Sequence, residues 1–224
     1  MSYIFEGSSD YLTYNALLDS DFAFGAGDFT IGFWTKLNSI VQQGFVGLDS
    51  TSVGVEILMT DATNIRVFVA GSAFNFTITT LVVGTWYYIL VVRSGTNLNV
   101  YRNSVQEGGT STSSGLVLNT LGAWIGSRTD PSSETLNGSL EEVSIWKGAA
   151  LNQNEINQLY TSKVKGISLQ VRPQSLVLYL PLNEFPNGST ITGIGAARDR
   201  SKFPKNFDQN GTITASANSL SSYQ

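Results

Sequence analysis

Short runs in which apolar and polar residues alternate recur along this chain, and clusters of Gly, Asn, Ser and Asp separate them. In the run FTIGFWTK, Phe29, Ile31 and Phe33 fall on one side of an extended strand. The run WYYILVVR, which begins at Trp86, is apolar on both sides, as is typical of a central strand. The same period of two occurs in NIRVFVA and in FNFTI. The pattern predicts an all-β protein made of short strands and turns.

One segment follows the period of a helix instead. Asn152 and Glu155 stand at the spacing of a capping box, in which each side chain binds the backbone N–H of the other residue. Ile156, Leu159 and Tyr160 follow at the i, i+3, i+4 spacing of an apolar helix face. We therefore expect one short amphipathic α-helix at this point in the chain.

Four longer motifs follow one another through the first 160 residues. They are FEGSSDYL (5–12), GDFTIGFWTKL (27–37), WYYILVVRSGTNLNVYRNS (86–104) and LNGSLEEVSIWKGAALNQNEINQLY (136–160). In this order and combination they resemble the laminin-G-like, concanavalin A-like jelly-roll family, which also includes the pentraxins. The resemblance covers most of the chain. It implies an antiparallel β-sandwich of two sheets in jelly-roll topology, with one short α-helix.

The length of 224 residues fits one large all-β domain over residues 1–224. The C-terminal extension, residues 164–224, contains SLVLYLPLNE, AARDRS and NGTITAS. In many family members such segments precede the FEGSSDYL-type motif, so the resemblance implies a circularly permuted domain whose tail returns a strand to the sandwich. The alternative is a linker followed by a fragment of a second repeat. We favour the permutation, because an exposed apolar strand edge would promote aggregation.

The chain contains no Cys and no His. Zinc sites with thiolate or imidazole ligands, a Cys nucleophile, a Ser-His-Asp triad and a His general base are therefore excluded. The net charge of -4 provides no electrostatic attraction to phosphate backbones, so we expect no nucleic-acid partner. With 42% hydrophobic and only 13% charged residues, the composition allows a large core and a surface of mostly neutral polar residues.

Membrane insertion is not expected, because no apolar run is long enough to span a bilayer. The opening MSYIFEGSSDYL has neither the basic nor the apolar region of a signal peptide. We therefore expect a soluble protein with no signal peptide in this chain. The resemblance to an extracellular type of domain favours a place outside the cell or on a virion surface.

Among the carboxylates of this sequence, Glu141 is the hardest to explain by a purely structural role. In LEEVSIW it alternates with Val143 and Ile145, so it is expected to point into the core, where a carboxylate needs a partner. In related jelly rolls an Asp at this position can hold a structural calcium ion together with carboxylates of the N-terminal motif. The resemblance therefore implies a Ca²⁺ site formed by Glu6, Asp10 and Glu141, whose oxygens suit calcium. The alternative is a hydrogen-bonded or Arg-paired carboxylate.

Catalytic carboxylates are not evident in the sequence. The Glu-x-Asp-x-x-Glu cluster of the related retaining glucanases is absent. Glu141 and Glu142 are adjacent, so we expect them to point to opposite faces, where they cannot flank one glycosidic bond. We therefore expect that the protein is not an enzyme.

Aromatic residues on the non-core face could form a platform for sugar rings. Trp124 and Arg128, in GAWIGSRTD, end a strand beside the polar loop 129–135, and Tyr101 and Trp146 join them as ligand-binding candidates. The alternative is that these aromatic residues pack against a neighbouring sheet or helix.

Three functions are compatible with these features. The first is a non-enzymatic surface component of a virus or phage particle, of the decoration or fibre type, that contacts glycans. The second is a carbohydrate-binding adhesion module excised from a bacterial surface protein, and the third, disfavoured for want of acid and base residues, is a glycosidase or lyase. We expect glycans or other surface or capsid proteins as partners, and a homo-oligomer if the protein is built into an assembly.

Overall fold

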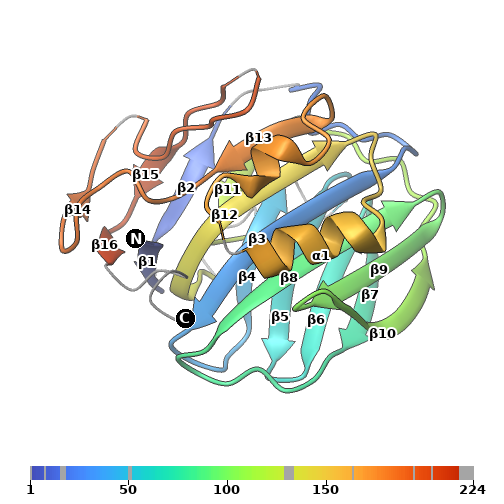
Figure 1. Ribbon diagram of the computed structural model, residues 1–224, viewed down its shortest axis with the longest axis horizontal. Coiled ribbons are helices and arrows are strands. Elements are labelled where there is room, and N and C mark those ends of the chain that lie inside the picture. Colours follow the sequence, from blue (N-terminus) through green and yellow to red (C-terminus); the bar gives the residue numbers. More distant parts are fainter. Residues whose placement is uncertain are drawn as a thin grey trace.

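The computed structural model describes residues 2–7, 9–15, 19–49, 52–128, 134–162, 164–193, 195–202 and 204–216. Within these residues, two antiparallel sheets face each other and one α-helix lies outside them (Figure 1). The predicted fold class, an all-β sandwich of the concanavalin A-like type with one short helix, is confirmed.

The larger sheet, sheet A, carries the helix on its outer face. In spatial order its strands are β10 (Val105–Thr112), β9 (Asn97–Arg102), β8 (Trp86–Ser94), β3 (Phe29–Leu37), β12 (Asn137–Lys147), β1 (Ser2–Glu6), β16 (Ile213–Ser216) and β14 (Thr190–Ile191), with β13 (Leu176–Leu180) also paired to β12. The strand β8 lies between β9 and β3, so the predicted central position of WYYILVVR is confirmed.

The second sheet, sheet B, forms the opposite layer. Its strands, in spatial order, are β15 (Asp208–Asn210), β2 (Tyr11–Tyr14), β11 (Ala123–Ile125), β4 (Gln43–Leu48), β5 (Val55–Asp61), β6 (Asn64–Val69) and β7 (Ser72–Thr77).

The main core lies between the two sheets and follows the alternation seen in the sequence. Phe29, Ile31 and Phe33 of β3 are fully buried there, and the Phe33 ring lies 5.1 Å from that of Phe45 across the sandwich. Trp34 points to the opposite side of sheet A and belongs to a second apolar cluster. The strands β3 and β8 thus separate two apolar layers, which explains why WYYILVVR is apolar on both sides.

The second cluster is covered by the helix α1 (Gln153–Ser162) and the short 3₁₀ helix η1 (Ile167–Gln170). The predicted capping box is confirmed: Asn152 Oδ1 accepts hydrogen bonds from the N–H groups of Asn154 and Glu155, and Glu155 Oε2 accepts one from Asn152 N at 2.8 Å. Figure 1 shows α1 across the strands of sheet A, where Ile156 and Leu159 are buried.

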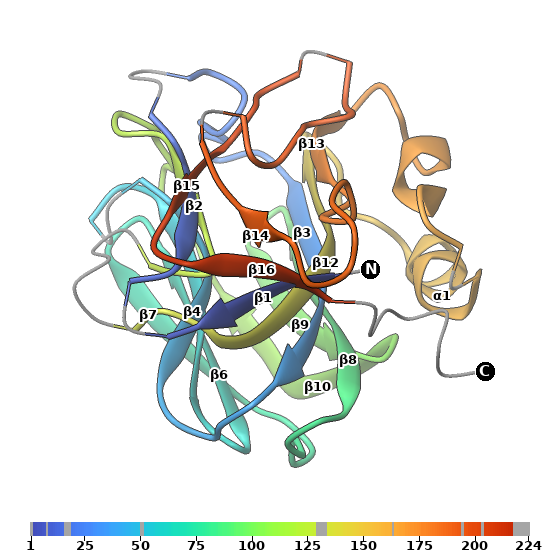
Figure 2. The same ribbon diagram turned by 90° about the vertical axis from the view of Figure 1, so that its left-hand side faces the viewer.

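The C-terminal segment contributes strands to both sheets. β13 pairs with β12, β16 pairs with β1, and β15 pairs with β2. β13 ends at Leu180, directly before Pro181, as expected for a residue that cannot donate a backbone hydrogen bond. Figure 2 shows β14, β15 and β16 beside β1 and β2. Whether this arrangement is a circular permutation of the family's domain stays a prediction.

None of the helices in the part of the chain that the structure describes is long and apolar enough to cross a membrane.

Candidate functional site

A row of residues that are partners across neighbouring strands crosses the outer face of sheet B and includes aromatic, hydroxyl and carboxylate side chains. Trp124 of β11 is in register with Thr13 on one side and Gly47 on the other; Gly47 is in register with Glu56, and Glu56 with Phe68. Residues on either side of each of these positions belong to the main core, such as Ala123 and Ile125 around Trp124. Because successive side chains of a strand point to opposite faces, the side chains of the row point away from the core.

Trp124 supplies the aromatic surface of this row. Its side chain is half-buried, and its neighbour in β4 is Gly47, which has no side chain. On the far side, Thr13 Oγ1 donates a hydrogen bond to Asn15 Oδ1 at 2.9 Å. The indole is therefore flanked by a residue without a side chain and by hydroxyl and amide groups.

Arg128 lies over the other part of the row and is held in one orientation. Its Nε donates to Glu56 Oε2 at 2.8 Å, its Nη1 donates to Glu134 Oε2, and its guanidinium lies 5.0 Å from the centre of the Phe68 ring. Glu56 is fully buried, so it depends on such partners. Burial alone would lower the pKa of Arg128, but the hydrogen bond that it donates to Glu134 and the negative charge of Glu56 outweigh burial and raise the pKa.

A close approach between two backbones fixes the segment that carries Arg128. Gly44 N donates to Glu134 O at 2.6 Å. A Cβ atom at Gly44 would lie 2.5 Å from Arg128 N and 2.9 Å from Glu134 O, so a larger residue would push this segment away from β4. The part of the predicted polar loop between these two residues, 129–133, lies outside the described residues.

The structure does not bring Tyr101 and Trp146 to this row, because both belong to sheet A. Tyr101 is half-buried at the margin of the cluster beneath α1. Trp146 is fully buried, and its Nε1 donates to Val171 O at 2.7 Å. The expectation that Trp146 contacts a ligand is therefore corrected: its ring packs under the helical cover, as the packing alternative predicts.

The three carboxylates expected to bind calcium do not form a common site. Glu6 is exposed, whereas Asp10 is buried and accepts hydrogen bonds from Glu6 N at 2.7 Å and Thr212 N at 2.6 Å. Among the described residues, no group of three or more acidic side chains is arranged to hold a metal ion. The carboxylate of Asp10 thus joins the β1–β2 turn to the β15–β16 turn. That the protein binds Ca²⁺ at all stays a prediction.

A β-bulge corrects the predicted orientation of Glu141. Glu141 is in register with Trp34 but Ser144 with Gly32, so β12 holds one residue more than β3 in this stretch. The extra residue is Glu142, whose φ of 55° lies in the left-handed region. As a result Glu141 does not point into the main core. It faces the outer side of sheet A together with Glu142, and the two are not on opposite faces.

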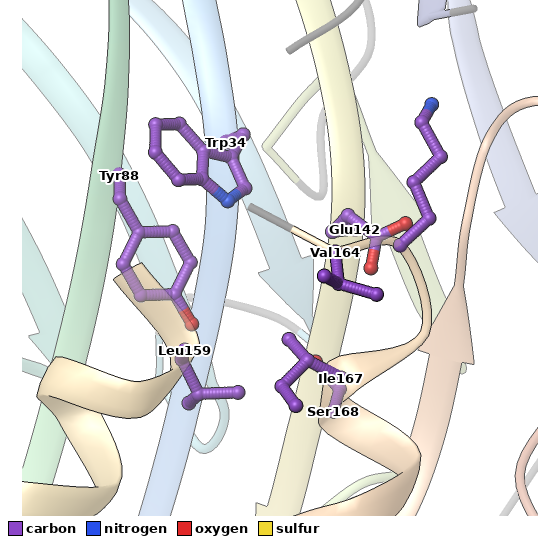
Figure 3. Close-up of a pocket in the computed structure, with 8 residues that line it drawn as sticks. Trp34, Tyr88, Glu142, Leu159, Val164, Ile167 and Ser168 are labelled. Atoms are coloured by element: carbon purple, nitrogen blue, oxygen red, sulfur yellow. The ribbon is translucent and has the colours of Figure 1, made fainter. Parts of the chain in front are cut away.

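Both carboxylates are closed off by the segment between α1 and η1. Glu141 is fully buried, with Lys165 Nζ 3.0 Å from its Oε2, and Glu142 accepts hydrogen bonds from Tyr179 Oη and from Gly166 N. Figure 3 shows Glu142 facing the residues of this covering segment. The cavity beside it, about 10 Å³, is about the minimum for one water molecule.

Burial is the largest influence on the pKa values of Glu141 and Glu142. Loss of hydration raises the pKa of Glu141 to about 7, although the charge of Lys165 opposes the shift. Burial also raises the pKa of Glu142, against the opposing hydrogen bonds from Gly166 and Tyr179. Such carboxyl groups could serve as general acids at an open site, but here the covering segment leaves no room for a sugar.

The comparison with protein families decides which group this fold represents. The model of the concanavalin A-like lectin/glucanases superfamily matches residues 6–157. The chain belongs to this superfamily. No curated protein sequence matches the chain significantly.

Solved structures share the fold of this superfamily member at low sequence identity. A suggested carbohydrate-binding protein from Bacteroides ovatus is 17% identical with a TM-score of 0.68, and covers 98% of this chain. This chain spans 61% of that protein. A heptameric SAP-like pentraxin from Limulus polyphemus is 17% identical (TM-score 0.57; 71% of this chain, 81% of the pentraxin). Domain 4 of an extracellular arabinanase from Geobacillus stearothermophilus, in complex with arabinotriose, is 14% identical (TM-score 0.56; 71% and 76%).

The sequence names Trp124 and Arg128 as candidates, but it does not reveal the residues that hold Arg128 in place. Glu56 stands in the alternating run VEILM, where its outward position could have been read, but its pairing with Arg128 links residues far apart in the sequence. Glu134 and Gly44 give no local signal in the sequence, because their roles depend on the approach of the loop before β12 to the strand β4.

Proposed function

We propose that this protein is a non-enzymatic glycan-binding module and that the sugar binds on the outer face of sheet B, against Trp124. The observation that carries the proposal is the row in which the half-buried indole of Trp124 lies two strands from Glu56, which together with Glu134 holds the guanidinium of Arg128 in place. An indole face packs against the apolar face of a sugar ring, and fixed polar groups bind its hydroxyls.

The arrangement around Arg128 suits the binding of a sugar without catalysis. Arg128 has five N–H donors in a planar fork, and Glu56 and Glu134 occupy only part of them, so the remainder can bind sugar oxygens. Because the arginine is already immobilised, binding costs little side-chain entropy. The comparisons support this reading at the level of the fold, since two of the similar structures are described as binding carbohydrate.

The absence of activity is part of the proposal. The buried pair Glu141 and Glu142 is enclosed by its covering segment, and the carboxylates near Trp124 are engaged by Arg128. A glycosidase needs two carboxyl groups on either side of an accessible bond. We therefore expect no release of reducing ends from a glycan panel.

We further propose that the module belongs to the surface of a virus or phage particle. The absence of Cys and the abundance of neutral polar residues support this context. The alternative, a bacterial adhesion module that is part of a longer protein, agrees equally with glycan binding. Electron microscopy of the native assembly distinguishes them, because a particle component would occupy a repeated position in it.

The site is tested by comparing two aromatic variants. The change Trp124→Ala should weaken binding to glycans selected on an array by at least about tenfold, which corresponds to about 1.4 kcal/mol. The change Tyr101→Ala, on sheet A, should leave the affinity unchanged. Calorimetric titration measures both, and thermal melting checks that each variant is folded. Equal affinity of the Trp124→Ala variant and the wild type would contradict the proposed site.

A further inference from the structure

A polar hollow opens at the end of sheet B where the loop after β2 meets the loop before β15. It has a volume of about 610 Å³ and is lined by Tyr14, Asn15, Gly195, Arg198, Asn206 and Asp208. A second hollow of about 270 Å³ shares Gly195 and Arg198 with the first and adds Glu184, Phe185 and Arg200. The volume of the first hollow falls in the range of small-molecule sites. Figure 2 shows β2 and β15 side by side at this edge.

The acidic residues of the hollow are already engaged by uncharged donors. Asp208 Oδ1 accepts a hydrogen bond from Gly195 N at 2.8 Å. Glu184 Oε2 accepts one from Tyr3 Oη at 2.9 Å, and Glu184 Oε1 accepts one from Arg198 N at 3.2 Å. By contrast, the guanidinium groups of Arg198 and Arg200 are exposed and form no ion pair with any described residue.

The backbone that presents the two arginines is firmly held. Asp199, between them, is buried, and its carboxylate accepts hydrogen bonds from the N–H groups of Tyr179, Ser201 and Lys205, each between 2.8 and 2.9 Å. Arg200 N donates to Tyr179 O at 2.8 Å. A buried anchor thus fixes the segment while the side chains on either side of it extend outward. The backbone on both sides of Asp199 is thereby fixed, while neither guanidinium forms an ion pair within the described part of the chain.

The hollow continues the row that contains Trp124. Asp208 of β15 is in register with Thr13 of β2, and Thr13 with Trp124 of β11. Asn15, which lines the hollow, accepts the hydrogen bond of Thr13. Two strand spacings, about 10 Å, therefore separate Trp124 from the edge of the hollow. A short saccharide that stacks on Trp124 can extend into it.

We infer that this hollow binds the carboxylate of an acidic sugar residue, of the uronate type, in the saccharide that packs on Trp124. The guanidinium fork matches the planar carboxylate and can bind it through two parallel hydrogen bonds. A single isolated charge suits the site better than a heavily sulfated chain, because Glu184 and Asp208 and the net charge of -4 repel polyanions. The inference rests on the proposed glycan binding and adds the chemical class of the ligand.

The test uses saccharides that differ only in charge. Tetragalacturonate, a mannuronate tetrasaccharide and a hyaluronan tetrasaccharide are titrated alongside their methyl esters, which keep the sugar rings and remove the negative charge. The wild type should prefer at least one acid over its ester by about tenfold at low salt. Added salt should reduce this preference, because exposed charges are screened.

The variant Arg198→Gln should abolish the preference for the acid. The matched control is Arg66→Gln, which removes the same charge from the outer face of sheet B, where Arg66 Nε donates to Asn75 Oδ1. The control should retain the preference. Equal binding of acid and ester by the wild type, or a preference that survives in Arg198→Gln, would overturn the inference.

The outcomes separate this inference from the proposed function. If neutral glycans bind in a manner sensitive to Trp124→Ala while no acid is preferred, the proposed function stands and the inference fails. If acids are preferred through Arg198 while Trp124→Ala has no effect, the hollow binds carboxylates and the site at Trp124 is wrong. If none of the saccharides binds at millimolar concentration, the inference fails outright.

Discussion

At the scale of single residues, Glu141 shows how one inserted residue changes a chemical interpretation. In a regular strand its neighbours Val143 and Ile145 would place it in the main core, but the bulge at Glu142 turns it to the outer face, where Lys165 is its ion-pair partner. Burial still dominates its ionisation. The predicted need for a partner was right, although the predicted calcium ligands were not brought together.

Glu141 should make stability depend on pH. Its pKa rises from 4.5 to about 7 on folding, so between these values the folded state binds more protons than the unfolded state, and stability falls as pH rises. The shift corresponds to about 3 kcal/mol lost across this window. In Glu141→Gln the fall should be much smaller. Denaturant unfolding at several pH values between 5 and 8 measures it.

The matched variant Lys165→Met should act in the opposite direction. Removing the positive charge takes away an interaction that lowers the pKa of Glu141, so stability should continue to fall above pH 7. If Glu141→Gln retains the wild-type slope, another group is responsible for the pH dependence.

At the scale of elements, the sequence predicted strands and helix well because local chemistry specifies them. The period of two in FTIGFWTK and the capping box at Asn152 both act within a few residues, and the structure confirms both. The bulge in β12 could not be predicted, since Glu142 is not a glycine and its positive φ is stabilised by remote bonds to Tyr179 and Gly166. The sequence thus predicts strands and the helix better than it predicts a β-bulge within a strand.

The candidate site was predictable only in part for the same reason. Trp124 and Arg128 stand out in the sequence by type and by their place at a strand end, whereas the hollow around Arg198 is formed by loops that approach only in the folded chain. Trp146 was misjudged, because alternation gives the face of a strand but not what covers that face.

The β9–β10 hairpin offers a test of an element. Its turn residues Asn103 and Ser104 have φ values of 51° and 67°, as a two-residue type I′ turn requires. Asn103 Oδ1 also accepts a hydrogen bond from Tyr88 N, whereas the Ser104 side chain has no hydrogen bond to any residue that the structure describes, and its backbone oxygen accepts one from Gln153 Nε2. Ser104→Gly should therefore stabilise the protein by about 0.5–1 kcal/mol, because glycine adopts positive φ without strain.

The control for this change is Asn103→Gly, which relieves the same strain but loses the bond to Tyr88 and should give no net gain. Thermal melting distinguishes the two variants. A lower melting temperature for Ser104→Gly than for the wild type would mean that the turn does not set the stability of this hairpin.

At the scale of the whole molecule, the C-terminal segment closes the sandwich. It supplies a partner to β12 and also to β1 and β2, which lie at the other end of the sequence. Several of its large side chains are fully buried in the main core: Leu178, Leu180, Leu182, Ile191, Phe207 and Ile213. The segment 2–162 by itself would therefore expose a broad apolar surface and unpaired strand edges.

Truncation after Lys165 should abolish cooperative folding. Each large apolar side chain withdrawn from the core forfeits about 1.5–3 kcal/mol, so these six together rival the whole stability of a domain, about 5–15 kcal/mol. The truncated chain should be insoluble or lack a cooperative melting transition. In the full-length chain, Leu178→Ala, at a fully buried position, should cost about 2–5 kcal/mol, and Val177→Ala, at a half-buried one, clearly less. A soluble 1–165 fragment that melts near the full-length temperature would show instead that residues 166–224 are dispensable for the sandwich.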